Sequence, residues 1–97
     1  MTARPAYVIG HITVKDAGKW AEYRSKVPET IAPWNAELVL RGELAEVLCG
    51  QHEHSDTVVI RFPSLAALQG WYRSDAYQAL IPLREQAADL VLIAYEA

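Results

Sequence analysis

The sequence predicts an α+β protein with the element order β-α-β-β-α-β. Four segments are rich in β-branched, aromatic and aliphatic residues, the composition that favours strands. Amphipathic stretches follow the first and third of these segments, with apolar residues at the three- and four-residue spacing of one helix face. With 97 residues, of which 52% are hydrophobic, the chain is long enough for one domain, residues 1–97, and too short for two.

The first predicted strand covers residues 6–14. Gly10 and His11 stand at its middle, where neither is usual, because glycine has no side chain to pack and histidine titrates near neutral pH. Gly10 indicates that another group, either a helix aromatic or a partner's backbone, approaches closely on its face of the strand.

Asp16 is the predicted N-cap of the first helix. The apolar stripe of this helix is typical of a helix packed on a sheet and consists of Trp20, Tyr23, Val27 and Ile31. Pro28 should loosen the last turn, and Pro33 prevents the helix from running far past Ile31.

A hairpin follows, with strands at 37–41 and 57–62. Gly42 is the predicted position of a bulge that bends the first of these strands, and 43–48 is expected to continue extended. The polar segment 50–56 connects the two strands.

Ser64 is the predicted N-cap of the second helical region. Its apolar stripe consists of Leu65, Leu68 and either Trp71 or Tyr72. Ser74 and Asp75 end this helix and begin a shorter one at 76–88, which Pro82 divides or kinks. The segment 90–95 is the fourth strand.

This order of elements is the split βαβ, ferredoxin-like topology. Right-handed crossovers place both helical regions on one face of a four-stranded antiparallel sheet, with the first and third strands at its centre. The other face of the sheet would be uncovered in a monomer. A second copy of the chain is the simplest cover for that face, so we expect a homodimer.

Alternation gives each of the first three strands one apolar face and one mixed face. If the apolar faces align, the mixed faces converge, and they carry His11, Thr13, Glu37, Arg41, Thr57 and Arg61. Two arrangements are open. Either the apolar face packs under the helices and the mixed face meets a partner, or the mixed face lies under the helices. In the second case it forms a pocket walled by Trp20, Tyr23, Trp34, Trp71 and Tyr72.

His11 is the predicted catalytic residue, as a general base that removes a proton from an acidic carbon or a phenol. The alternative is a hydrogen-bonded histidine that fixes the dimer or the seam between sheet and helices. Arg41 and Arg61 lie on neighbouring strands and are predicted to bind a substrate carboxylate. The alternative for them is ion pairing with Glu37, Glu43 or the partner chain.

Four aromatic side chains are the predicted walls of the substrate site, with core packing as the alternative: Trp20, Tyr23, Trp34 and Tyr72. The histidines and carboxylates of the segment 52–56 do not follow a structural zinc spacing, so we expect surface loop residues and no metal site. Cys49 is the only cysteine, which excludes an intramolecular disulfide. No cofactor is expected.

The formal charge of −3 and the pI of about 5.5 show no basic face for nucleic acid. No apolar run approaches the roughly 20 residues that cross a bilayer, and the start of the chain has no signal-peptide pattern. We expect no membrane partner and a cytoplasmic location, in keeping with the single cysteine.

A combined pattern extends over nearly the whole chain: YVIGHITV at 7–14 with WAEY at 20–23, RG at 41–42 before EVL at 46–48, VIRFPS at 59–64, WYRS at 71–74, YQ at 77–78 and PLR at 82–84. The combination resembles a large bacterial family catalogued as domain-of-unknown-function family 1330. The resemblance implies a dimeric α+β barrel, in which two ferredoxin-like sheets close against each other. The wider superfamily is similar in fold to cofactor-free monooxygenases, haem-dependent enzymes, muconolactone isomerase-type enzymes and ligand sensors, so it implies no single activity.

We therefore expect a small homodimer that binds an aromatic or carboxylate-bearing molecule and acts as a cofactor-independent oxygenase or isomerase. In this hypothesis His11 is the base and Arg41 or Arg61 holds the anion. The alternative is a non-catalytic ligand-binding or structural dimer, in which the same residues serve the interface.

Overall fold

The computed structural model describes residues 4–97. Its sheet has the strand order β2-β3-β1-β4, and every neighbouring pair is antiparallel. The strands are β1 (Ala6–Val14), β2 (Glu37–Glu43), β3 (Asp56–Phe62) and β4 (Ala88–Glu96). The predicted ferredoxin-like topology, with the first and third strands central, is confirmed.

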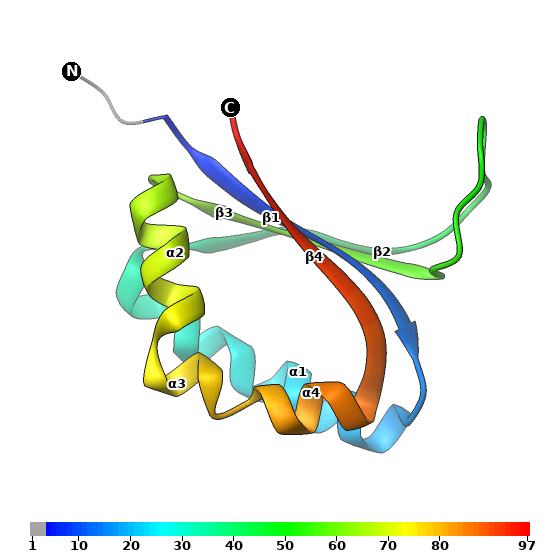
Figure 1. The fold of residues 1–97 in the computed structure, drawn as a ribbon, viewed down its shortest axis with the longest axis horizontal. Coiled ribbons are helices and arrows are strands. Elements are labelled where there is room, and N and C mark those ends of the chain that lie inside the picture. Colours follow the sequence, from blue (N-terminus) through cyan, green and yellow to red (C-terminus); the bar gives the residue numbers. More distant parts are fainter. Residues whose placement is uncertain (1–3) are drawn as a thin grey trace.

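All helices lie on one face of the sheet, which is curved around them (Figure 1). They are α1 (Ala17–Ile31), the single 3-10 turn η1 (Ala32–Trp34), α2 (Leu65–Arg73), α3 (Asp75–Gln78) and α4 (Ile81–Ala87). The predicted caps are present: the Lys19 amide donates to Asp16 Oδ1 at 3.0 Å, and the Ala67 amide donates to Ser64 Oγ at 3.1 Å. Pro82 lies in the first turn of α4, where its missing N–H costs no hydrogen bond, so the helical region after Ser74 is divided as predicted.

The apolar face of β1 packs beneath the helices, which decides between the two arrangements left open by the sequence. Ala6, Val8 and Ile12 are buried on that face. Gly10 lies among them, and a Cβ atom built on it would be 2.9 Å from Val58 Cγ1 and 3.0 Å from Leu92 Cδ2. The predicted close approach at Gly10 is therefore confirmed, but the neighbours are side chains of the flanking strands.

Two predictions about β2 are wrong. The bulge lies at Val39, where the pairing register shifts between Leu38 and Leu40, and Gly42 pairs regularly with Thr57. The strand ends at Glu43, so the expected extension to residue 48 is absent. Because β2 is an edge strand, only β3 holds it, and beyond Glu43 the chain leaves the sheet as a projecting loop (Figure 1).

The centre of the core lies where α2 crosses the sheet. Trp71 is 2% exposed, and its ring centroid lies 5.3 Å from that of Phe62 and 4.3 Å from that of Tyr77. Its indole Nε1 donates to Thr30 Oγ1 on α1 at 2.9 Å, so the buried polar atom of the ring is satisfied. This single side chain joins β3, α1 and α3.

Candidate functional site

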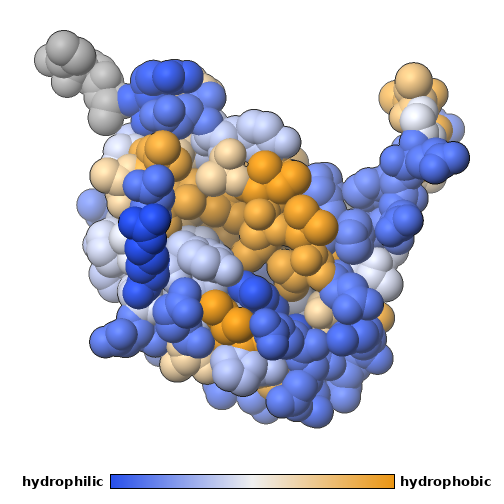
Figure 2. Space-filling model, viewed as in Figure 1, coloured by the Kyte–Doolittle hydropathy of each residue, from blue (hydrophilic) through white to orange (hydrophobic). Residues whose placement is uncertain are grey.

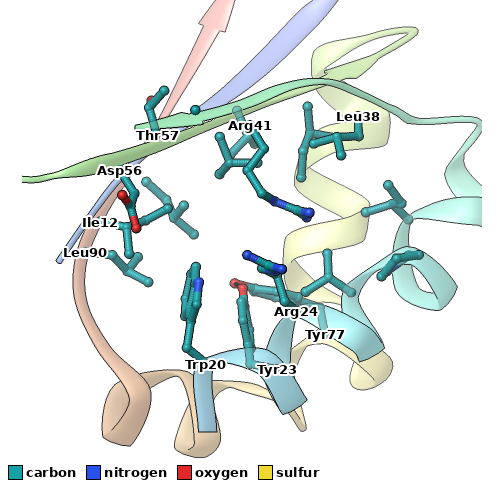
Figure 3. Close-up of a pocket in the computed structure, with 18 of the residues that line it drawn as sticks. Ile12, Trp20, Tyr23, Arg24, Leu38, Arg41, Asp56, Thr57, Tyr77 and Leu90 are labelled. Carbon is teal, nitrogen blue, oxygen red and sulfur yellow. Dashed lines mark hydrogen bonds between the residues drawn. The ribbon is translucent and has the colours of Figure 1, made fainter. Parts of the chain in front are cut away.

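A cavity of ≈ 280 Å³ lies between α1 and the helix-facing side of the sheet (Figure 3). Aliphatic side chains from every strand form much of its wall, among them Val8, Ile12, Leu38, Val58, Ile60 and Leu92. A largely apolar cavity of this size with a few polar groups is the usual form of a small-molecule site.

Two guanidinium groups face each other across this cavity (Figure 3). Arg24 projects from α1 and Arg41 from β2, and both line the cavity. Neither forms an ion pair or a side-chain hydrogen bond with another residue of 4–97. Both arginines remain partly open to solvent, and the partial desolvation of Arg41, followed by the charge of Arg24, lowers the pKa of Arg41 below its ordinary value. Two like charges that face one another without a direct ion-pair partner indicate a place for an anion between them, although Glu43 and Asp56 also line the cavity.

The bulge at Val39 explains why Arg41 lies in the cavity. Without it, strict alternation puts Leu38 and Arg41 on opposite faces. The extra residue reverses the alternation, so that Leu38 pairs with Ile60 and Arg41 with Val58, both on the helix-facing side. The predicted convergence of all six mixed-face residues is therefore wrong for Arg41.

Arg61 stays on the uncovered side of the sheet, hereafter the open face. Its Nη1 lies 3.4 Å from Glu37 Oε1, and both side chains are well exposed. Arg41 and Arg61 thus do not face a common space, and Arg61 forms the ion pair that was its alternative interpretation. Arg24 was missed by the sequence reasoning. Its spacing was the available signal, since it follows Trp20 by four residues and precedes Val27 by three.

Two phenols form the helix side of the cavity. Tyr23 Oη and Tyr77 Oη are 2.8 Å apart, and Arg84 Nη1 donates to Tyr77 Oη at 2.9 Å. Burial raises the pKa of Tyr23 well above its ordinary value, with further contributions from Tyr77. Tyr23 is therefore a neutral hydrogen-bond donor at physiological pH and does not act as a base. Trp20 stacks on it, with centroids 5.2 Å apart.

The four predicted aromatic walls divide into two pairs. Trp20 and Tyr23 line the cavity, whereas Trp34 and Tyr72 do not. Trp34 packs over Gly70 on α2, where an added Cβ would lie 2.6 Å from its ring, and Tyr72 packs against Trp71.

His11 lies on the open face, opposite the cavity. It follows Gly10 and precedes Ile12, which face the helices, so alternation points its side chain the other way, as it does for its cross-strand partners Thr57 and Val91. The projecting loop brings the other two histidines near it. The ring centroids of His11 and His52 are 4.9 Å apart, those of His52 and His54 are 5.8 Å apart, and His54 Nδ1 lies 3.0 Å from Thr13 Oγ1. Within residues 4–97 no group of histidine, cysteine and carboxylate side chains is arranged to hold a metal ion.

Two carboxylates line the end of the cavity away from Leu38. Asp56 and Glu43 are cross-strand partners at the ends of β3 and β2, and Asp56 is half-buried. The cavity thus combines cations, a phenol donor and carboxylates, which are the groups that proton transfer requires.

No helix among residues 4–97 is long and apolar enough to cross a membrane.

A family model described as "Domain of unknown function (DUF1330)" matches residues 5–97, which confirms the predicted resemblance. No curated protein matches the chain.

Several solved structures share the fold. A protein of unknown function from Rhodopseudomonas palustris has a TM-score of 0.82 and 18% identity, over 97% of this chain and 82% of that one. SnoaB, a cofactor-independent oxygenase from Streptomyces nogalater, has a TM-score of 0.69 and 12% identity, over 98% and 94%. A dimeric ferredoxin-like protein of unknown function from Jannaschia sp. has a TM-score of 0.73 and 11% identity, over 96% and 99%. At these identities the similarity shows the ferredoxin-like fold alone.

Proposed function

Since the chain belongs to the DUF1330 family, whose description assigns no activity, we propose a function from the cavity itself: it binds a small organic anion, an aromatic or alicyclic carboxylate. The observation that carries this proposal is the pair Arg24 and Arg41, which face each other across an apolar space without an ion-pair partner in residues 4–97. A carboxylate between them accepts hydrogen bonds from both guanidinium groups and offsets their repulsion.

The size and walls of the cavity support a ligand with one or two rings. Its volume of ≈ 280 Å³ is near the lower end of the roughly 300–1,000 Å³ usual for small-molecule sites. The Trp20 ring, stacked on Tyr23, offers an aromatic surface beside the aliphatic wall. A planar ring with one carboxylate fits both the charge and the walls.

We also propose that the protein acts on this ligand without a cofactor, as an isomerase or an oxygenase. The cavity has an anion-binding pair, a phenol donor in Tyr23 and carboxylates in Asp56 and Glu43 that can accept a proton. SnoaB, which has the same fold, is described as a cofactor-independent oxygenase. His11 does not line this cavity, so Asp56 is the better candidate base here, and a role for His11 would need a separate site on the open face. Non-catalytic ligand binding is the alternative, and it predicts saturable binding without turnover.

Matched ligands and matched arginine variants test the binding proposal. By calorimetry, 2-naphthoate should bind the wild-type protein and 2-naphthamide should bind at least tenfold more weakly. Arg41→Gln and Arg24→Gln should each weaken naphthoate binding about 10- to 100-fold, because a hydrogen bond to a charged group contributes about 1.5–3 kcal/mol. Arg61→Gln and Arg73→Gln, which change arginines outside the cavity, should have no effect. Equal affinity for acid and amide, or equal loss in all four variants, would refute the proposal.

We infer further that two copies pack their open faces together as a dimeric α+β barrel. The face is apolar along its centre, where Ile9 pairs with Val59 and Ile93, and its neighbours Val91 and Tyr95 are about half exposed. Figure 2, which views the sheet from its β4 edge, shows hydrophobic side chains gathered over this edge strand. The Jannaschia protein with this fold is described as dimeric.

A further inference from the structure

The hydrogen bonds from Arg84 through Tyr77 to Tyr23 have a direction that the chemistry of the three groups fixes. A guanidinium can only donate, so Tyr77 Oη accepts from Arg84 Nη1 at 2.9 Å. Tyr77 is 0% exposed, and Tyr23 Oη, at 2.8 Å, is its other hydrogen-bond partner among residues 4–97. A buried hydroxyl hydrogen without an acceptor is costly, so Tyr77 donates to Tyr23.

This direction leaves the hydroxyl hydrogen of Tyr23 free to point into the cavity. Tyr23 lines the cavity, and Figure 3 shows its ring extending from α1 with the oxygen toward Arg24. Arg84 is the first donor in this series of hydrogen bonds. Its positive charge polarises both phenols, and this makes the Tyr23 hydroxyl a stronger donor. Arg84 does not line the cavity, so it makes no direct contact with a ligand there, and its hydrogen bond reaches the ligand through the two tyrosines.

We propose that Tyr23 Oη is an oxyanion-binding donor and that the ligand class is a carboxylate that also carries a phenol or enol oxygen, bound in its ionised form. The inference rests on the proposed function, because Arg24 and Arg41 hold the carboxylate of the same molecule. Preorganised donors aimed at a developing negative charge stabilise the ionised form. Arg84 and Tyr77 are positioning residues, and Tyr23 is the group that touches the ligand.

The probe for this proposal is 4-hydroxy-3-nitrobenzoate, whose phenolate absorbs visible light. Its absorbance is titrated against pH, free and with saturating protein. Bound to the wild-type protein, the phenol should ionise at a pH at least one unit lower than in solution. In Tyr23→Phe, the ratio of the affinities for the phenolate and the neutral phenol should fall at least tenfold. The affinity of this variant for 4-nitrobenzoate, which has no phenol, should stay within twofold of the wild-type value.

A variant of Arg84 distinguishes the effect of the Arg84–Tyr77–Tyr23 hydrogen bonds from the effect of packing around Tyr23. Arg84→Gln keeps a donor to Tyr77 but removes the charge, and it should return the bound ionisation pH part of the way toward the free value. Arg73→Gln, at an exposed position of α2, should leave it unchanged. If Tyr23→Phe does not fold, an unchanged ionisation pH in Arg84→Gln overturns the proposal by itself.

The outcomes distinguish this inference from the one on which it rests. If wild-type protein binds neither probe, the proposed carboxylate site fails. Suppose that 4-nitrobenzoate binds and that its binding depends on Arg41. If the bound hydroxynitrobenzoate then ionises at the same pH as in solution, only the role of Tyr23 as an oxyanion donor is refuted. The same holds if Tyr23→Phe retains the full decrease in ionisation pH.

Discussion

Replacing Trp71 with alanine is expected to lower the free energy of unfolding by about 3–5 kcal/mol. The side chain is nearly inaccessible and packs against the rings of Phe62 and Tyr77. Its removal leaves a cavity at the centre of the core and breaks the hydrogen bond to Thr30. Since small domains have only about 5–15 kcal/mol of total stability, this one change should remove a large part of it.

Urea unfolding followed by circular dichroism, at one fixed protein concentration, measures the loss. Trp20→Ala is the matched control, because it removes the same side chain from a half-buried place in the cavity wall. We expect the control to lose less than half as much stability as Trp71→Ala. Equal losses at the two positions would show that Trp71 is not the centre of the core.

Placing a carboxylate at the middle of the open face is expected to convert the proposed dimer into a monomer. Ile9 and Ile93 are cross-strand partners there, so Ile9→Asp would bury an unpaired charge in the proposed interface, which costs several kcal/mol. In sedimentation equilibrium the mass should fall from twice 10.8 kDa to 10.8 kDa, while the circular dichroism spectrum stays that of the folded chain.

Ala21→Asp is the control for this experiment. Ala21 is exposed on α1, so an added carboxylate there should leave the dimer intact. A wild-type protein that sediments as a monomer, or an Ile9→Asp variant that remains a dimer, would contradict the packing of open faces.

Local chemistry in the sequence predicted much of the fold. Asp16 and Ser64 cap the helices that they were expected to cap, because capping depends on the residue and on the amides that follow it. Pro82 divides the last helical region for an equally local reason. The period-2 pattern of β1 also showed correctly that one of its faces is apolar, although not which face the helices cover.

The candidate site could not be predicted in the same way, since it depends on a change of register. Nothing in the residues around Val39 marks a bulge there, and Gly42 was the more obvious position. The bulge decides that Arg41 faces the helices, whereas Arg61, on β3, lies on the open face with or without it. The Tyr23–Tyr77–Arg84 hydrogen bonds join segments far apart in the chain, so they depend on the packing of α1 against α3 and α4 and not on local spacing.

The position of Arg41 on an edge strand has a consequence for motion. β2 is hydrogen-bonded to β3 alone, and strands held on one side open locally more readily than the centre of a sheet. A carboxylate bound by Arg24 and Arg41 would join β2 to α1 and act as a removable cross-link between the two layers.

Amide hydrogen exchange in β2 should therefore slow when 2-naphthoate is added to the wild-type protein, whereas exchange in β1 should hardly change. In Arg41→Gln at the same naphthoate concentration, exchange in β2 should stay as fast as in the ligand-free protein, and equal slowing in both proteins would show that the ligand does not connect the layers through Arg41.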